Sequence, residues 1–192
     1  PDYPAMSYGG FRGKTRDITP TVAQIKDDML ILQAMGIKLL RTYNTSQYPH
    51  AKHLLAAIQE LRDEDPNFEM YVMIGTWIES ELAWTDDANH HKGNTLNNTT
   101  EVETAVAMAN QYPDIVKAIA VGNEAMVQWA VKYFVYPDII LKWVNHLQGL
   151  KKSGELPADI WITSSDNYES WGGGNTHYHT EDLEKLIKDN KI

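Results

Sequence analysis

An apolar segment that ends in an Asn-Glu pair is the part of this sequence best suited to chemistry. Residues 118–122 read Ala-Ile-Ala-Val-Gly, and Asn123 and Glu124 follow directly. A carboxylic acid at the end of a strand can act as a general acid or base, and an adjacent amide can hydrogen-bond a substrate hydroxyl. The pair could equally be structural, with Asn123 capping a helix and Glu124 supporting its first turn. Spacing alone favours this structural interpretation.

Aromatic side chains form a second group of candidates. The sequence holds 6 Trp and 10 Tyr but only 3 Phe, and rings with a polar tip suit the faces of carbohydrates as well as ordinary cores. Several fall at or just after the ends of predicted strands. They are Tyr8, Tyr43, Trp77, Trp84, Trp129, Tyr168 and Trp171. Any one of them is about as well explained by packing within a loop.

Five short apolar runs alternate with longer amphipathic segments. The runs predict strands at residues 5–8, 37–42, 69–74, 115–121 and 159–163. The first helix has Thr19 as its expected N-cap, Pro20 at its first position and Gly36 at its end. Further helices are expected at residues 50–63, 100–111, 137–152 and 180–189.

A strand–helix pattern repeated five times predicts a parallel sheet covered by helices. The longest connections, residues 76–98 and 123–136, follow the third and fourth strands. They therefore lie at the carboxyl ends of the strands, where both barrels and open α/β sheets place their active sites.

A flavodoxin-like or nucleotide-binding domain is the alternative α/β arrangement. Residues 8–15, Tyr-Gly-Gly-Phe-Arg-Gly-Lys-Thr, resemble a phosphate-binding loop, but Tyr8 occupies the position that requires the first glycine. No helix follows Lys14 directly, since the first helix is expected to begin only at Pro20. This interpretation is therefore the weaker one.

Charge and composition exclude several classes of protein. The 192 residues carry a net charge of −9, which would repel nucleic acid. The chain has no cysteine, so thiolate zinc sites and cysteine nucleophiles are excluded, and no apolar run is long enough to span a membrane. The neighbours His90 and His91 lack a third ligand, and His177 and His179 are equally weak candidates, so we expect neither metal nor cofactor.

Five segments together resemble glycoside hydrolase family 17, a family of β-1,3-glucanases with a retaining (β/α)8 barrel. The resemblance rests on Val-Gly-Asn-Glu at residues 121–124, Ser-Tyr-Gly at 7–9, Lys-Leu-Leu-Arg-Thr-Tyr at 38–43, Glu-Met-Tyr-Val-Met-Ile-Gly at 69–75 and Trp-Ile-Thr-Ser-Ser-Asp at 161–166. They occur in the family's order and are closest to its bacterial members, which act on laminarin-like glucans. The resemblance implies a TIM barrel (α/β class) of which residues 1–192 form the N-terminal part, about five βα units.

The resemblance also implies roles for individual residues. Glu124 would protonate the leaving oxygen and then activate water, Asn123 would hold the sugar 2-hydroxyl, and Arg41 would lie near the nucleophile and favour its ionised form. The other expected substrate-binding residues are Tyr8, Tyr43, Trp77, Trp129, Asp166, Tyr168 and Trp171. We further expect a secreted or periplasmic protein, although residues 1–4 do not resemble a signal peptide.

The chain departs from the family because it lacks a match for the second catalytic carboxylate. The family's nucleophile comes from a seventh strand, and only five strands are predicted here. The carboxylates on the expected active face do not match it: Glu79, Glu81, Asp86, Asp166 and Glu169. We therefore expect a fragment that is inactive alone and is completed by the C-terminal half of the barrel or a second chain. The alternatives are a non-catalytic β-glucan-binding half-barrel and a β-1,3-glucanosyltransferase.

Overall fold

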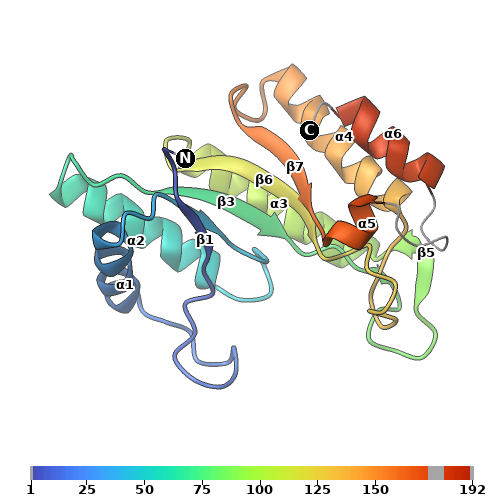
Figure 1. Ribbon diagram of the computed structural model, residues 1–192, viewed down its shortest axis with the longest axis horizontal. Coiled ribbons are helices and arrows are strands. Elements are labelled where there is room, and N and C mark those ends of the chain that lie inside the picture. Colours follow the sequence, from blue (N-terminus) through green and yellow to red (C-terminus); the bar gives the residue numbers. More distant parts are fainter. Residues whose placement is uncertain (1, 173–179, 191–192) are drawn as a thin grey trace.

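A five-stranded parallel sheet forms the centre of the computed structural model, which describes residues 2–172 and 180–190 (Figure 1). Its strands are β1 (Ala5–Ser7), β2 (Leu39–Arg41), β3 (Tyr71–Thr76), β6 (Val116–Asn123) and β7 (Trp161–Ser165). They are ordered β1-β2-β3-β6-β7, and each strand pairs in parallel with the next strand in this order. The five expected strands and their parallel arrangement are therefore confirmed.

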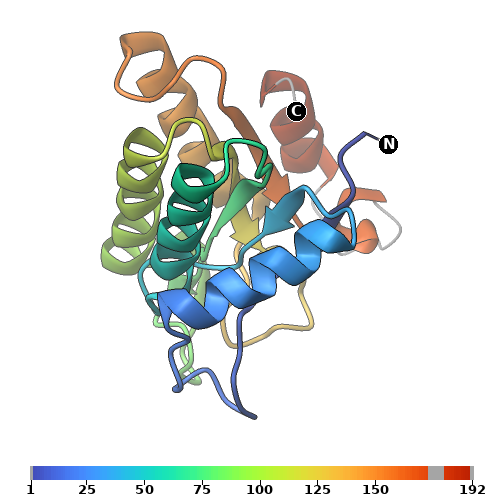
Figure 2. The same cartoon turned by 90° about the vertical axis from the view of Figure 1, so that its left-hand side faces the viewer.

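The helices lie around one face of the sheet (Figure 2). They are α1 (Val22–Ala34), α2 (His50–Glu64), α3 (Thr95–Gln111), α4 (Pro137–Ser153), α5 (Tyr168–Gly172) and α6 (Thr180–Asn190). Alternate strand residues such as Leu40, Val72 and Ile119 are fully buried against them in one continuous apolar core. This follows from the two-residue period of a strand, which sends successive side chains to opposite faces.

The other face of the sheet is open. Residues aligned across it include Leu39 beside Tyr71 and Ala118 beside Trp161, and they line an open groove of about 580 Å³ with Met73 and Thr163. Trp161 is 75% exposed there. Sequential strand order with helices on one face is the arrangement found in part of a (β/α)8 barrel. Closure into a barrel stays a prediction.

Two helices begin elsewhere than expected. The N-cap of α1 is Thr21, not Thr19, because the Thr21 hydroxyl accepts from the Gln24 N–H while the Gln24 side chain accepts from the Thr21 N–H. Helix α3 begins at Thr95, not residue 100, because the Asn94 side chain caps it by accepting from the Asn97 N–H. The expected start of α4 at Pro137 and the end of α1 before Gly36 are confirmed.

A hairpin, which was not expected, occupies the long connection after β3. It pairs β4 (Ser80–Glu81) with β5 (Asn89–Gly93), whose sequence lacks alternating apolar residues. Tertiary contacts hold it: the His90 ring stacks on Phe134 at 3.6 Å between centroids, and His90 Nδ1 lies 2.8 Å from the Phe134 carbonyl oxygen. The hairpin thus packs on the connection that follows β6.

Other sequence features have simple outcomes. Helix α5 was also unexpected and is only one short turn after β7. His177 and His179 lie outside the described residues. Within the described part of the chain, none of the helices has the length and apolarity needed to cross a membrane.

Candidate active site

Asn123 and Arg41 meet at the carboxyl ends of β6 and β2. Arg41 Nη2 donates to Asn123 Oδ1 at 2.5 Å, although the residues are 82 positions apart in sequence. A guanidinium has donors only, so this contact fixes the amide with its oxygen towards Arg41. The Asn123 Nδ2 group is left as the donor that can hydrogen-bond a ligand.

Glu124 leaves the strand in an unusual backbone conformation. Its φ of 49° lies in the left-handed region, which costs a non-glycine residue about 1–3 kcal/mol. The Glu124 N–H donates to the Ser165 carbonyl at 2.9 Å, and the residue is exposed. The helix-capping interpretation of the Asn-Glu pair is wrong, because the next helix begins only at Pro137 and Tyr136 is its N-cap.

The Asp166 carboxylate joins the ends of β6 and β7. It accepts from the Met126 N–H at 2.7 Å and from the Asn167 N–H at 2.9 Å. Burial raises the pKa of Asp166 above the usual value, and the negative charge of Glu124 adds to this rise. Asp166 thus supports the backbone that follows Glu124 and lies within range of its charge.

The raised pKa gives a testable dependence of stability on pH. Because folded Asp166 binds its proton more tightly than unfolded aspartate, its contribution to the free energy of unfolding should be present at low pH and be lost as pH rises above about 4. Asp166→Asn removes this contribution, so the advantage of the wild type over the variant should shrink between about pH 4 and pH 7. Urea unfolding across this range measures it. A constant difference would contradict the prediction, and exposed Asp159→Asn is the control.

An aromatic cluster of Trp77, Trp84 and Tyr133 lies beyond β3. Its ring centroids are 4.9 Å apart for Trp77 and Tyr133, 5.1 Å for Trp84 and Tyr133, and 6.2 Å for the stacked indoles. The three rings line an open groove of about 700 Å³. The remaining lining residues are Arg16, Gln47 and Tyr48. Burial raises the pKa of Tyr133, and the negative charges of Glu124 and Asp166 raise it further. These two carboxylates therefore lie near the cluster.

A buried carboxylate, Glu79, lies beneath the two indoles. Its Oε2 accepts from Trp77 Nε1 at 3.1 Å and Trp84 Nε1 at 3.0 Å. Its Oε1 accepts from Asn94 Nδ2 at 3.0 Å and Asn97 Nδ2 at 2.7 Å. Four donors occupy the acceptor capacity of a carboxylate. Glu79 is therefore committed to holding its neighbours and has no position left for attack on a substrate.

The ends of β2 and β3 approach each other closely beside this site. A Cβ on Gly75 would lie 2.3 Å from the Thr42 carbonyl oxygen, so only glycine fits there. The Arg41 guanidinium carbon lies 5.4 Å from the centroid of the Tyr43 ring. Arg41 Nε is buried and has no hydrogen-bond partner among residues 2–172 and 180–190. Arg41 is thus held between Asn123 and Tyr43 at the carboxyl end of β2.

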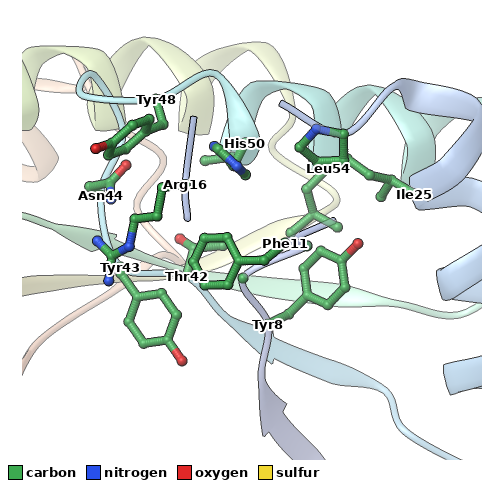
Figure 3. Close-up of a pocket in the computed structure, with 14 residues that line it drawn as sticks. Tyr8, Phe11, Arg16, Ile25, Thr42, Tyr43, Asn44, Tyr48, His50 and Leu54 are labelled. Atoms are coloured by element: carbon green, nitrogen blue, oxygen red, sulfur yellow. The ribbon is translucent and has the colours of Figure 1, made fainter. Parts of the chain in front are cut away.

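Four of the other predicted substrate-binding residues take no part in the contact between Arg41 and Asn123 or in the aromatic cluster. The Tyr8 hydroxyl donates to Asp28 Oδ2 at 2.6 Å, and Tyr8 lines a pocket of only about 20 Å³, room for about one water molecule (Figure 3). Trp171 packs partly buried against the core. Trp129 and Tyr168 are exposed, Tyr168 by 82%.

Comparison with known proteins finds solved structures that resemble this chain. The chain is similar to an endo-laminarinase. The solved structure of that protein, from Formosa Hel1_33_131, matches with a TM-score of 0.93 and 58% sequence identity. The match covers 97% of this chain but 47% of the other, so this chain spans about half the length of that protein. No protein-family profile and no curated protein matches the chain.

Two residues of the site were missed by sequence reasoning. Tyr133 was not selected, although it lies in the long connection after β6. Glu79 was considered only as a possible nucleophile, and its contacts with Trp77 and Trp84 come from a hairpin without a sequence pattern. A usable signal was present: Glu79 lies in a connection already identified as unusually long.

Proposed function

We propose that this chain is the N-terminal part of a family 17 glycoside hydrolase that cleaves β-1,3-glucan with retention of configuration. The observation that carries the proposal is the exposed Glu124 beside Asn123 at the carboxyl end of β6, in a chain 58% identical to an endo-laminarinase over 97% of its length. Barrel hydrolases place their reacting groups at this end of the strands.

The proposed mechanism assigns Glu124 both proton transfers. As an acid it protonates the glycosidic oxygen, and as a base it later removes a proton from the attacking water. Asn123 Nδ2 donates to the 2-hydroxyl of the sugar, an orientation that the contact between Arg41 and Asn123 Oδ1 supports. A hydrogen bond to this hydroxyl strengthens in the transition state.

The proposed nucleophile comes from outside this chain. A retaining enzyme needs a second carboxylate about 5–5.5 Å from the first, and Glu79 and Asp166 are both occupied by hydrogen bonds that hold the fold. Arg41 ends β2 at the same edge of the sheet, where its positive charge would favour the ionised form of an incoming carboxylate. We propose that the C-terminal half of a barrel, or a second chain, covers the open face and supplies this group.

Two alternatives remain in the same substrate class. A β-glucan-binding half-barrel without turnover would use the aromatic residues but not Glu124. A β-1,3-glucanosyltransferase would use Glu124 but pass the glucosyl unit to a sugar rather than to water. We also propose a secreted or periplasmic location, where a polysaccharide is accessible.

Laminarin digestion with an intact-mass measurement tests the proposal. A protein with the mass of a complete barrel should release short glucose oligomers, and proton NMR should show the β-anomer first. Initial α-anomer would contradict retention, and products longer than the substrate would favour the transferase. A mass of 21.8 kDa with laminarin binding but no products would favour the binding half-barrel.

A further inference from the structure

The exposed indole of Trp84 needs an explanation beyond core packing. Trp84 is 58% exposed, yet its ring stacks on Trp77 and its indole N–H donates to the Glu79 carboxylate. Its backbone φ is 69°, and nearby Leu82 has a φ of 57°, both strained for residues with side chains. Strain of this kind is usually kept where it positions a functional group. Burial of apolar area cannot account for a ring that faces solvent.

We propose that the aromatic cluster is a stacking subsite for a glucose unit away from the cleavage point, with Glu79 as the residue that positions its indoles. The inference rests on the proposed function, since it names part of the site for the same neutral glucan. Aromatic faces suit the apolar face of a pyranose ring, while polar groups at the edge bind its hydroxyls. Arg16, Gln47 and Tyr48 supply such groups in the same groove.

Two buried carboxylates prepare the subsite before any sugar binds. Glu79 is 2% exposed and holds both indole N–H groups. Glu101 Oε2 accepts the backbone N–H of Trp77 at 3.0 Å, so Trp77 is fixed at its main chain and at its ring. Rings held in this way lose little conformational freedom on binding, which favours affinity.

The aromatic cluster is also continuous with the proposed point of cleavage. Tyr133 contacts both indoles and lies near enough to Glu124 for the carboxylate charge to affect it. The backbone N–H of Trp84 donates to the Lys132 carbonyl at 2.7 Å, which fixes the hairpin to the connection that follows Glu124. A glucan chain held at Glu124 can therefore extend over Tyr133 onto the indoles.

Calorimetric titration of the chain with laminarin tests the proposal. Trp84→Ala should weaken binding about tenfold, whereas Trp84→Phe, which keeps a ring, should stay within about threefold. Glu79→Gln should weaken binding severalfold, because its new NH₂ group faces donors. It should also reduce the near-ultraviolet circular dichroism of the paired indoles. Trp161→Ala is the matched control, since Trp161 is an exposed tryptophan at the amino end of β7, whereas Glu124 follows the carboxyl end of β6.

Each outcome decides something. If Trp84→Ala binds laminarin as tightly as the wild type does, the subsite is wrong and the proposed function stays intact. If Glu79→Gln alters thermal stability alone, its positioning role is wrong. Absence of laminarin binding by the wild type would overturn the subsite. Weakened binding in Trp84→Ala beside unchanged hydrolysis in Glu124→Gln would support the subsite and contradict the proposed catalytic role.

Discussion

Glu124→Gln is expected to lower the rate of laminarin hydrolysis by about 10³-fold in the complete enzyme. The amide keeps the size of the side chain and its left-handed backbone, but it can neither protonate the glycosidic oxygen nor activate water. Initial rates from reducing-end release measure the loss. Azide should restore part of the rate with substrates that have a good leaving group, because azide attacks a glycosyl-enzyme without help from a base.

The matched control for this variant is Glu169→Gln. Glu169 is an exposed carboxylate on α5, just after β7, at the same end of the sheet as Glu124. Its replacement should leave the rate within about twofold, since it makes no proposed contact with the reacting atoms. If Glu124→Gln keeps the wild-type rate, or if Glu169→Gln shows the large loss instead, the assignment of the acid/base is wrong.

Glu101→Ala should reduce the free energy of unfolding by about 3–5 kcal/mol. The Glu101 carboxylate is 1% exposed and accepts from three successive residues of the connection after β2. Its donors are the N–H of Thr45, the N–H and hydroxyl of Ser46, and the N–H groups of Gln47 and Trp77. Alanine leaves several of these donors buried and unpaired, and each such donor costs about 1–3 kcal/mol.

Urea unfolding of the variant measures this cost. Glu103→Ala is the control, because Glu103 lies two residues further along α3 and is exposed. It should change the unfolding free energy by less than about 0.5 kcal/mol. A loss below about 1 kcal/mol for Glu101→Ala would show that water readily replaces the carboxylate, and would remove Glu101 from the support of Trp77.

These two predictions concern an exposed carboxylate and a buried supporting carboxylate of the same proposed site. Glu124 is exposed and strained, which suits its proposed role as the reacting group. Glu79 and Glu101 are buried and saturated with donors, which suits a supporting role. We therefore propose distinct roles for three carboxylates with the same chemistry, because their surroundings differ. Residue type alone did not separate them.

Local pattern was enough to predict the five strands of the parallel sheet and helices α1 to α4 and α6. Short apolar runs predicted all five strands of the sheet, and their sequential parallel order follows from the intervening helices. Pro137 and Gly36 marked helix boundaries correctly because each acts through its own backbone angle. The Asn-Glu pair was likewise visible, because it directly follows an apolar strand.

Only the tertiary structure decided how the site is held. The contact of Arg41 with Asn123 joins residues 82 positions apart, and Glu79 meets Trp84 through a hairpin whose sequence does not alternate. Glu124 has a left-handed backbone, and Ser165, on another strand, accepts its N–H. Sequence patterns report the preferences of neighbouring residues, whereas these contacts depend on packing between distant segments, which overrides local preference.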